Sequence, residues 1–308
     1  MSVFASSSAS FNPVISQAVN EVDRQSFVGQ LLLPVVGVGT SKGTYVVVEA
    51  NQFDNDLAKP REPGSNFASA SSEYTSASYD CLEYGIEVAI DDLELAQAET
   101  DAQYDVATVT ANQIADDLAI GHEIRCATSL SGASFNSTAA TAAMSVVATA
   151  TPIADINNAV LRLNANGMFR GIHLAMEASL YAEMLQTDDM RQLINGSGTM
   201  TWAEDQVARV LGVEGIVVCN TRYNAAKKGQ SRSASKIWPD DAYYVMQIGD
   251  GAFSNGGVGR TLAYTPRGGL YTTETFRTEQ PPSSVVRVRQ NVDEVIINAN
   301  AGEEITGA

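Results

Sequence analysis

The residues that could do chemistry are few, and the first candidates lie in one short segment around His122. His122 and Cys126 are four positions apart in a stretch with helical periodicity, so both side chains would lie on one helix face. The pair His122-Glu123 is typical of zinc proteases, but Cys126 stands where that motif requires its second histidine. Two ligands do not make a zinc site. We therefore predict no metal site and expect His122 to be an ordinary helix-face residue.

A glycine-rich segment at 249–259 has the composition of a phosphate-binding loop. Such a loop needs a helix N-terminus directly after its glycines, because the helix amides and dipole bind the anion. The next predicted element is instead a strand at 261–265, and the chain contains no Gly-Lys-Ser or Gly-Lys-Thr. A Gly-x-Ser-x-Gly elbow is also absent, and no Cys–His pair is evident. We predict no catalytic residue, no cofactor and no enzyme.

The composition limits the partners of the chain. It has 308 residues, of which 19 are Lys or Arg and 36 are Asp or Glu, giving a net charge of −17. A protein that binds nucleic acid by its phosphates needs the opposite sign, so direct DNA or RNA binding is not expected. Three widely spaced cysteines fit a reducing cytosol. The longest apolar run, at 31–36, is too short to span a membrane.

The charges are unevenly distributed along the chain. Between Glu83 and Ile124 there are eleven acidic residues and no Lys or Arg. From Arg222 to Arg289 there are ten basic residues and five acidic ones. The acidic segment is either a solvated face or a surface that faces something negative without binding it. An acidic part and a basic part also allow copies of the chain to associate with one another.

The first third of the chain predicts two strands separated by a long excursion. Strands are predicted at 44–50 and 83–90 from their β-branched and aromatic residues and from alternation. The polar segment 51–78 lies between them, and compact domains rarely carry such a loop unless it has a function. We expect the excursion, taken as 51–80, to pack mainly on a neighbouring subunit.

A long helix is predicted at 101–130, after a short one at 91–99. The apolar residues of the long helix recur at steps of three and four and so form one stripe. We expect this stripe to pack on the sheet of the closing strands; it comprises Ala107, Ala111, Ile114, Leu118 and Ile124. Asp105, Asp116 and Glu123 are expected to point away from that sheet.

The rest of the chain predicts an α/β segment followed by strands, so the fold class is α+β. Residues 131–151 read as a linker or covering loop. Helices are predicted at 153–165, 176–186 and 201–211, and strands at 171–175, 215–219, 242–248, 261–265, 270–278, 284–290 and 293–299.

This order of elements resembles the Hong Kong 97-type major capsid protein of tailed bacteriophages, over nearly the whole chain. Four features carry the resemblance. They are the Leu-Leu-Pro-Val-Val passage at 32–36 with the strand after it, the excursion at 44–90 with the return passage Tyr-Gly-Ile-Glu-Val-Ala-Ile-Asp-Asp at 84–92, the long helix at 101–130, and the α/β segment at about 153–265, which includes Leu-Gly-Val at 211–213 and Thr-Arg-Tyr-Asn at 221–224. Each motif alone is weakly specific, and their joint order makes the match. The resemblance implies an N-terminal arm (1–42), an extended loop with flanking strands (43–90), a peripheral domain with a spine helix (91–152), an axial domain (153–265) and closing strands that return to the peripheral domain (266–308).

The resemblance also implies a function and partners. The chain is expected to assemble into hexamers and pentamers of an icosahedral virion head shell, in the host bacterial cytoplasm, around double-stranded DNA that it does not bind by sequence. Only about a dozen residues precede the arm, so scaffolding is expected from a separate protein, beside a portal and a decoration protein. The resemblance does not extend to cross-linking, because the excursion has one lysine, Lys59, without a matching acid–asparagine arrangement.

The residues expected to contact neighbouring subunits lie in the excursion and in the basic part. They are Phe53, Lys59, Arg61, Phe67, Arg222, Lys227, Lys228 and Arg232. Two other functions remain open at this point. One is an encapsulin-like nanocompartment shell, which has the same fold and a different cargo, and the other is a cytosolic enzyme whose site the sequence does not reveal.

Overall fold

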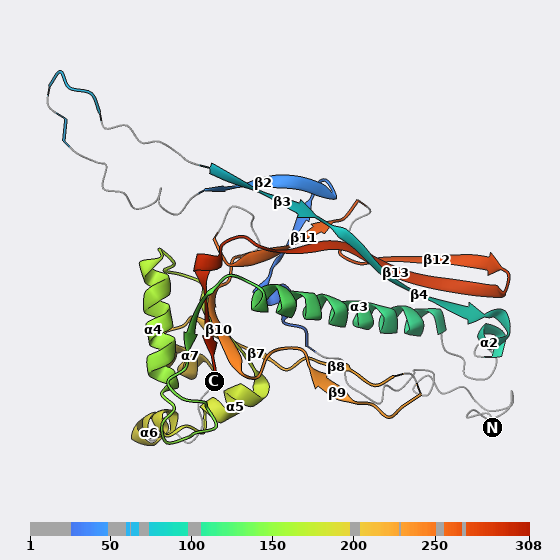
Figure 1. The fold of residues 1–308 in the computed structure, drawn as a ribbon. Helices are drawn as coiled ribbons and strands as arrows, with labels where there is room; N and C mark the ends of the chain where they lie inside the picture. The colour runs from blue at the N-terminus through green and yellow to red at the C-terminus, as the bar shows by residue number, and fades with distance from the viewer. Residues whose placement is uncertain are drawn as a thin grey trace.

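The computed structural model describes residues 26–48, 60–61, 63–67, 74–97, 106–197, 204–227, 229–250, 256–266 and 269–308. Two five-stranded sheets organise the described chain, and a long helix passes between them (Figure 1). The first sheet extends along the helix, and the second is surrounded by shorter helices at one end of the molecule. Two separate two-stranded ribbons complete the structure.

The first sheet is built around one long strand, β13 (Pro282–Ile296). One edge of β13 pairs with β4, and the other edge pairs with β12 and then with β11. The edge strand β1 runs parallel to β11. The strands besides β13 are β1 (Val35–Val38), β4 (Leu82–Asp91), β11 (Gly259–Tyr264) and β12 (Thr272–Glu279). The sequence predicted two strands in place of β13, because polar residues at its middle interrupt the alternation.

The long helix α3 (Val106–Ser131) confirms the predicted helix over its described length, while residues 101–105 lie outside the described residues. Ile114 and Leu118 are buried with Ile90, Val286 and Val288 of the first sheet. Ala107 and Ala111 pack against the same cluster, so the predicted stripe is confirmed at these four positions. Ile124 is the exception, because 37% of its surface is exposed. The short helix α2 (Asp92–Gln97) precedes α3.

The second sheet has the strand order β5–β14–β10–β6–β7. Its strands are β5 (Asn136–Ala139), β6 (Ile172–Glu177), β7 (Gly215–Cys219), β10 (Ala242–Gln247) and β14 (Gly302–Thr306). Its helices are α4 (Pro152–Ala165), α5 (Ala178–Met184), α6 (Asp188–Ser197) and α7 (Glu204–Leu211). α4 begins with a proline, which fits the first turn because that position needs no amide donor.

The central strand β10 is buried on both faces, which explains its unbroken apolar run. Tyr243 and Val245 belong to the core shared with α4–α7, whereas Tyr244 and Met246 belong to a second core on the opposite face. The second core contains Leu130 of α3, and it contains Leu33, which follows the short helix α1 (Gly29–Leu32). The sheet therefore joins the helical end of the molecule to α3.

Several elements were not predicted, and the boundary expected at residue 265 does not separate the two sheets. β3 (Tyr74–Asp80), β5, α6 and β14 are among the additional elements. β11 lies before the expected boundary but pairs in the first sheet, while β14 lies after it and pairs in the second. The closing strands thus divide between both sheets instead of returning together to one.

The two ribbons lie outside the sheets. β2 (Lys42–Val48) pairs with β3, so the excursion begins as a hairpin of its own chain and β4 departs from it into the first sheet. β8 (Arg222–Asn224) pairs with β9 (Ala234–Lys236). Figure 1 shows the first ribbon on the outer side of the first sheet and the second ribbon on the other side of α3. A 3-10 turn, η3 (Ala299–Ala301), joins β13 to β14.

Candidate functional site: a buried junction and the assembly surfaces

A buried carboxylate of α3 joins three segments that are far apart in the sequence. Glu123 is fully buried, and its Oε2 accepts a 2.6 Å hydrogen bond from the amide of Gly29 in α1. Its Oε1 accepts bonds from the Val28 amide at 3.2 Å, the Thr221 hydroxyl at 3.1 Å and the Trp238 indole at 2.8 Å. Four donors surround one carboxylate, which is the arrangement that makes a buried charge tolerable.

Glu123 was expected to point away from the sheet of the closing strands, and its four partners lie outside that sheet; its complete burial was not predicted. The N-terminal half of α3 has one buried face, but the C-terminal half is enclosed by the arm, the first sheet and the second core. Glu123 consequently acts as an attachment point for the segment 28–33. A Cβ atom on Gly29 would lie 2.7 Å from the Glu123 carboxylate, so only glycine permits this approach. Of the other acids of this set, Asp116 is half-buried and Asp105 lies outside the described residues.

His122 is also buried rather than exposed on the helix face. Its Nε2 lies 3.2 Å from the Thr261 hydroxyl, 3.5 Å from the Glu294 carboxylate and 3.6 Å from the Cys126 sulfur. Burial, with the Arg125 charge nearby, lowers the pKa of His122 to about 4, so the ring is neutral at pH 7. Arg125 donates to Glu294 at 3.0 Å and stacks on the Tyr84 ring at 3.8 Å.

The sequence placed His122 and Cys126 on one helix face, and the electrostatics of this Cys–His pair are those of an inert pair. Burial raises the pKa of the Cys126 thiol, and the Glu294 and Glu123 carboxylates raise it further. A nucleophilic cysteine needs a lowered thiol pKa and access to substrate, and Cys126 has neither because it is fully buried. The pair packs α3 on the strands and does not activate a thiolate.

We predict that the three thiols of the folded protein react slowly with a disulfide reagent at pH 8. Burial raises the pKa of Cys81 to about 11 and raises those of Cys126 and Cys219 as well, so thiolate is scarce at every position. The measurement is colour release over time, with and without denaturant. Fast release of one equivalent from folded protein would contradict the burial of these residues.

A second contact that could suggest catalysis joins the Ser179 hydroxyl to the Lys236 amine. The Lys236 ammonium donates a 2.7 Å hydrogen bond to Ser179 Oγ, which resembles a serine–lysine nucleophile pair. A lysine base must be neutral, however, and the hydrogen bond to Asp240, with the Glu177 charge, raises the pKa of Lys236. The Ser179 hydroxyl donates to Glu177. The geometry therefore holds a cation and a helix cap, not a general base.

The glycines near 249–259 are explained by a buried arginine. Arg260 is 1% exposed, and its guanidinium donates to the Gly259 carbonyl at 2.8 Å and to the Gly256 carbonyl at 2.7 Å. A Cβ atom on Gly249 would overlap this guanidinium. The glycines therefore admit the Arg260 side chain, and the strand β11 follows them, as the sequence predicted.

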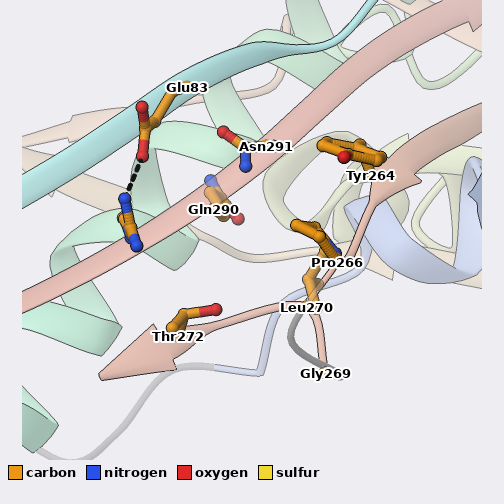
Figure 2. Close-up of a pocket in the computed structure, with 9 residues that line it drawn as sticks. Glu83, Tyr264, Pro266, Gly269, Leu270, Thr272, Gln290 and Asn291 are labelled. Carbon is orange, nitrogen blue, oxygen red and sulfur yellow. Dashed lines mark hydrogen bonds and ion pairs between the residues drawn. The ribbon is translucent and has the colours of Figure 1, made fainter. Parts of the chain in front are cut away.

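A polar hollow of about 250 Å³ lies where β11 ends and β12 begins along the same edge of β13. Figure 2 shows Glu83, Asn291, Tyr264 and Thr272 around it. Glu83 is paired with Arg289 at 2.8 Å, and Arg289 also binds Glu274, so the charges at the hollow are satisfied within the chain. Among the described residues no group of three His, Cys, Asp or Glu side chains could hold a metal ion. None of the described helices is both long and apolar enough to cross a membrane.

Part of the acidic segment is neutralised by the basic segment of the same subunit. Three ion pairs connect β4 and α2 to β12 and β13: Glu83–Arg289, Glu87–Arg287 and Asp92–Arg277. All three are screened by solvent, so they contribute little to stability. These charges are already paired, and association of copies must use others.

The residues expected to contact neighbours fall into three groups. Arg61 stacks on the exposed Phe67 ring at 4.7 Å, so these two excursion residues contact each other. Arg222 forms an ion pair with Glu177 at 3.0 Å inside its own subunit, whereas Lys227 and Arg232 are exposed in the loop between β8 and β9. Phe53, Lys59 and Lys228 lie outside the described residues.

The fold matches solved structures across almost the whole chain, whereas no protein-family model and no curated protein sequence matches it. A phage-related protein from Bordetella bronchiseptica RB50 superposes with a TM-score of 0.68 at 14% identity, covering 96% of this chain and 97% of that one. The capsid of cyanophage P-SCSP1u gives 0.65 at 16% identity, covering 97% and 92%. The mature capsid of bacteriophage PhiM1 gives 0.60 at 13% identity, covering 94% and 90%.

The chain has the Hong Kong 97-type capsid fold. The fold expected from the resemblance is thus confirmed, with α3 as its long helix. The burial of Glu123, Glu177 and Glu303 was not predicted, because a buried acid has no signature in a single acidic sequence. Glu177 caps α5 by accepting the Ser179 amide, but glutamate is not among the residues preferred at this position, so its residue type provided no cap signal.

Proposed function

We propose that this chain is the major capsid protein of a tailed bacteriophage, which assembles into the icosahedral head shell around double-stranded DNA. The observation that carries the proposal is the match of the fold to phage capsid structures over almost the whole of both chains. We assign the first sheet with α3 to the peripheral domain and the second sheet with α4–α7 to the axial domain.

The surface of the isolated subunit supports assembly. Val46 and Tyr74 lie near the same end of the β2–β3 ribbon and are each 62% exposed, and Phe67 is 76% exposed. Apolar side chains on a two-stranded ribbon gain little from their own chain, because an isolated ribbon is marginally stable in water. Contact with a neighbouring copy would bury them and order the ribbon.

The proposal includes further partners and a location. The shell consists of hexamers and pentamers, a separate scaffolding protein guides assembly in the host cytoplasm, and a portal and a decoration protein complete the head. The net charge of −17 supports an inner wall that encloses DNA without retaining its phosphates. The raised pKa values of Cys126, beside His122, and of Lys236, beside Ser179, support a structural role without catalysis.

The test of this function is the mass of the purified protein. Size-exclusion chromatography and electron microscopy should show closed particles of megadalton mass, with or without a co-expressed scaffold. A monomer or small oligomer under all these conditions would overturn the proposal. DNA-free shells that enclose a cellular enzyme would indicate a nanocompartment instead.

We predict that removing residues 55–72 leaves a folded subunit that no longer forms closed shells. The deletion keeps β2 and β3, which end at Val48 and begin at Tyr74, so the sheets lose no strand. Circular dichroism checks folding, and electron microscopy checks assembly. A matched replacement of 55–72 by a Gly/Ser linker of equal length controls for chain length, and normal shells from either variant would refute the intersubunit role.

A further inference from the structure

The β8–β9 ribbon carries a positive charge that contrasts with the rest of the chain. Residues 222–236 contain five basic side chains and no acidic one, so their net charge is +5. The remaining residues therefore carry −17 − 5 = −22. Figure 1 shows this ribbon projecting away from the second sheet. A basic projection on a strongly acidic molecule is suited to contact acidic surface.

The base of the ribbon is held by one buried carboxylate. Glu177 is 2% exposed, and it binds Arg222 of β8 at 3.0 Å and Lys236 of β9 at 3.4 Å. Arg222 and Lys236 are paired across the two strands of the ribbon, so Glu177 binds both strands at the same position along it. The Glu177 side chain also accepts the Ser179 amide at the start of α5. The direction in which the ribbon leaves the second sheet is thereby fixed.

The tip of the ribbon is organised but its cations are not used within the subunit. The Asn224 side chain accepts hydrogen bonds from the amides of Ala226 and Ser233, which closes the loop. Lys227 and Arg232 are exposed, and no carboxylate of the described residues lies within ion-pair distance of either. Arg222 and Lys236 are thus neutralised at the base, and Lys227 and Arg232 keep their charges at the tip.

We propose that the tip of the β8–β9 ribbon docks on an acidic surface of a second copy of this chain, and that Glu177 is the positioning residue that aims it. The proposal rests on the proposed shell function and adds the contact and its chemistry. Each copy offers the complementary charge, since the chain outside the ribbon carries −22. Nucleic acid is the less favoured partner, because a few cations on such an acidic chain give weak phosphate binding.

The experiment compares shell assembly by wild-type protein and by the double variant Lys227→Glu/Arg232→Glu. We expect the variant to fold normally and to assemble about tenfold less well at low salt, because attraction at each contact becomes repulsion. The deficit should shrink at high salt, where exposed charges are screened. The control is Arg170→Glu/Arg191→Glu, which makes the same charge change at two exposed sites elsewhere and should assemble as wild type does.

A second variant, Glu177→Gln, tests the positioning role. We expect faster amide hydrogen exchange within 222–236 and unchanged exchange in β10, together with fewer shells from folded subunits. Its assembly should keep the salt dependence of the wild type, because the tip charges remain. Unchanged exchange in the ribbon would show that Glu177 does not aim it.

Each remaining outcome is decisive. Wild-type assembly by the Lys227→Glu/Arg232→Glu variant at low salt overturns the docking proposal and leaves the shell function intact. Normal assembly with reduced binding of a labelled DNA duplex to the shells would indicate that the ribbon binds nucleic acid. This outcome would also overturn the docking proposal. Failure of the wild type to form particles would overturn both the docking and the proposed function.

Discussion

Replacing Glu123 by Ala is expected to lower the free energy of unfolding by about 3–5 kcal/mol. The carboxylate accepts hydrogen bonds from Val28, Gly29, Thr221 and Trp238, and the substitution leaves all four donors without this acceptor. Glu123 is fully buried, so water cannot replace it without opening the structure. The loss should release the segment around α1 first, because two of the four donors are its backbone amides.

Chemical denaturation with tryptophan fluorescence measures this change, and Trp238 reports directly on the junction because its indole is one of the donors. Hydrogen exchange of the Val28 and Gly29 amides should become fast. Glu87→Ala is the matched control, since Glu87 forms an exposed ion pair with Arg287 and should cost about 1 kcal/mol or less. Equal effects of the two substitutions would contradict the role of Glu123 as an attachment point.

The elements governed by local periodicity could be predicted from the sequence, and α3 shows where this stops. Its N-terminal half contacts one sheet, so a single stripe with Ile114 and Leu118 describes it. Its C-terminal half is enclosed from several sides, and there Glu123 and His122 are buried while Ile124 is exposed. A periodic pattern assumes one buried face, and it fails where the tertiary structure provides more than one.

The prediction of two strands failed for a different reason. β5 (Asn136–Ala139) and β14 (Gly302–Thr306) are short and polar, and they pair with each other across more than 160 positions of the sequence. Their strand conformation comes from this pairing and not from their residues, because β-propensity depends on the neighbours that a strand meets. β13 shows the reverse effect, since its partners on both edges keep it continuous through polar positions.

The sequence predicted the charge balance of each segment but not which individual charges form ion pairs. The sequence showed an acidic segment and a basic one, and acid-to-base contact between copies was one interpretation. The register of β4 against β13 instead places Glu87 opposite Arg287 in the same subunit. Lys227 and Arg232, which lie exposed in the β8–β9 loop outside this register, remain available to a neighbour.

Replacing Leu118 by Asp is expected to prevent folding, at a cost of about 4 kcal/mol or more. Leu118 is 5% exposed in the cluster of Ile90, Ile114, Val286 and Val288, which offers an aspartate no cation. The cluster packs α3 on the first sheet, so the expected product is aggregated or unfolded protein and not a folded subunit that assembles poorly.

Leu93→Asp makes the same chemical change at a residue that is 66% exposed on α2, and it should alter stability by about 0.5 kcal/mol or less. The soluble fraction after expression and the denaturation midpoint distinguish the two. Soluble, stable Leu118→Asp subunits would mean that α3 does not pack on β13 through this face.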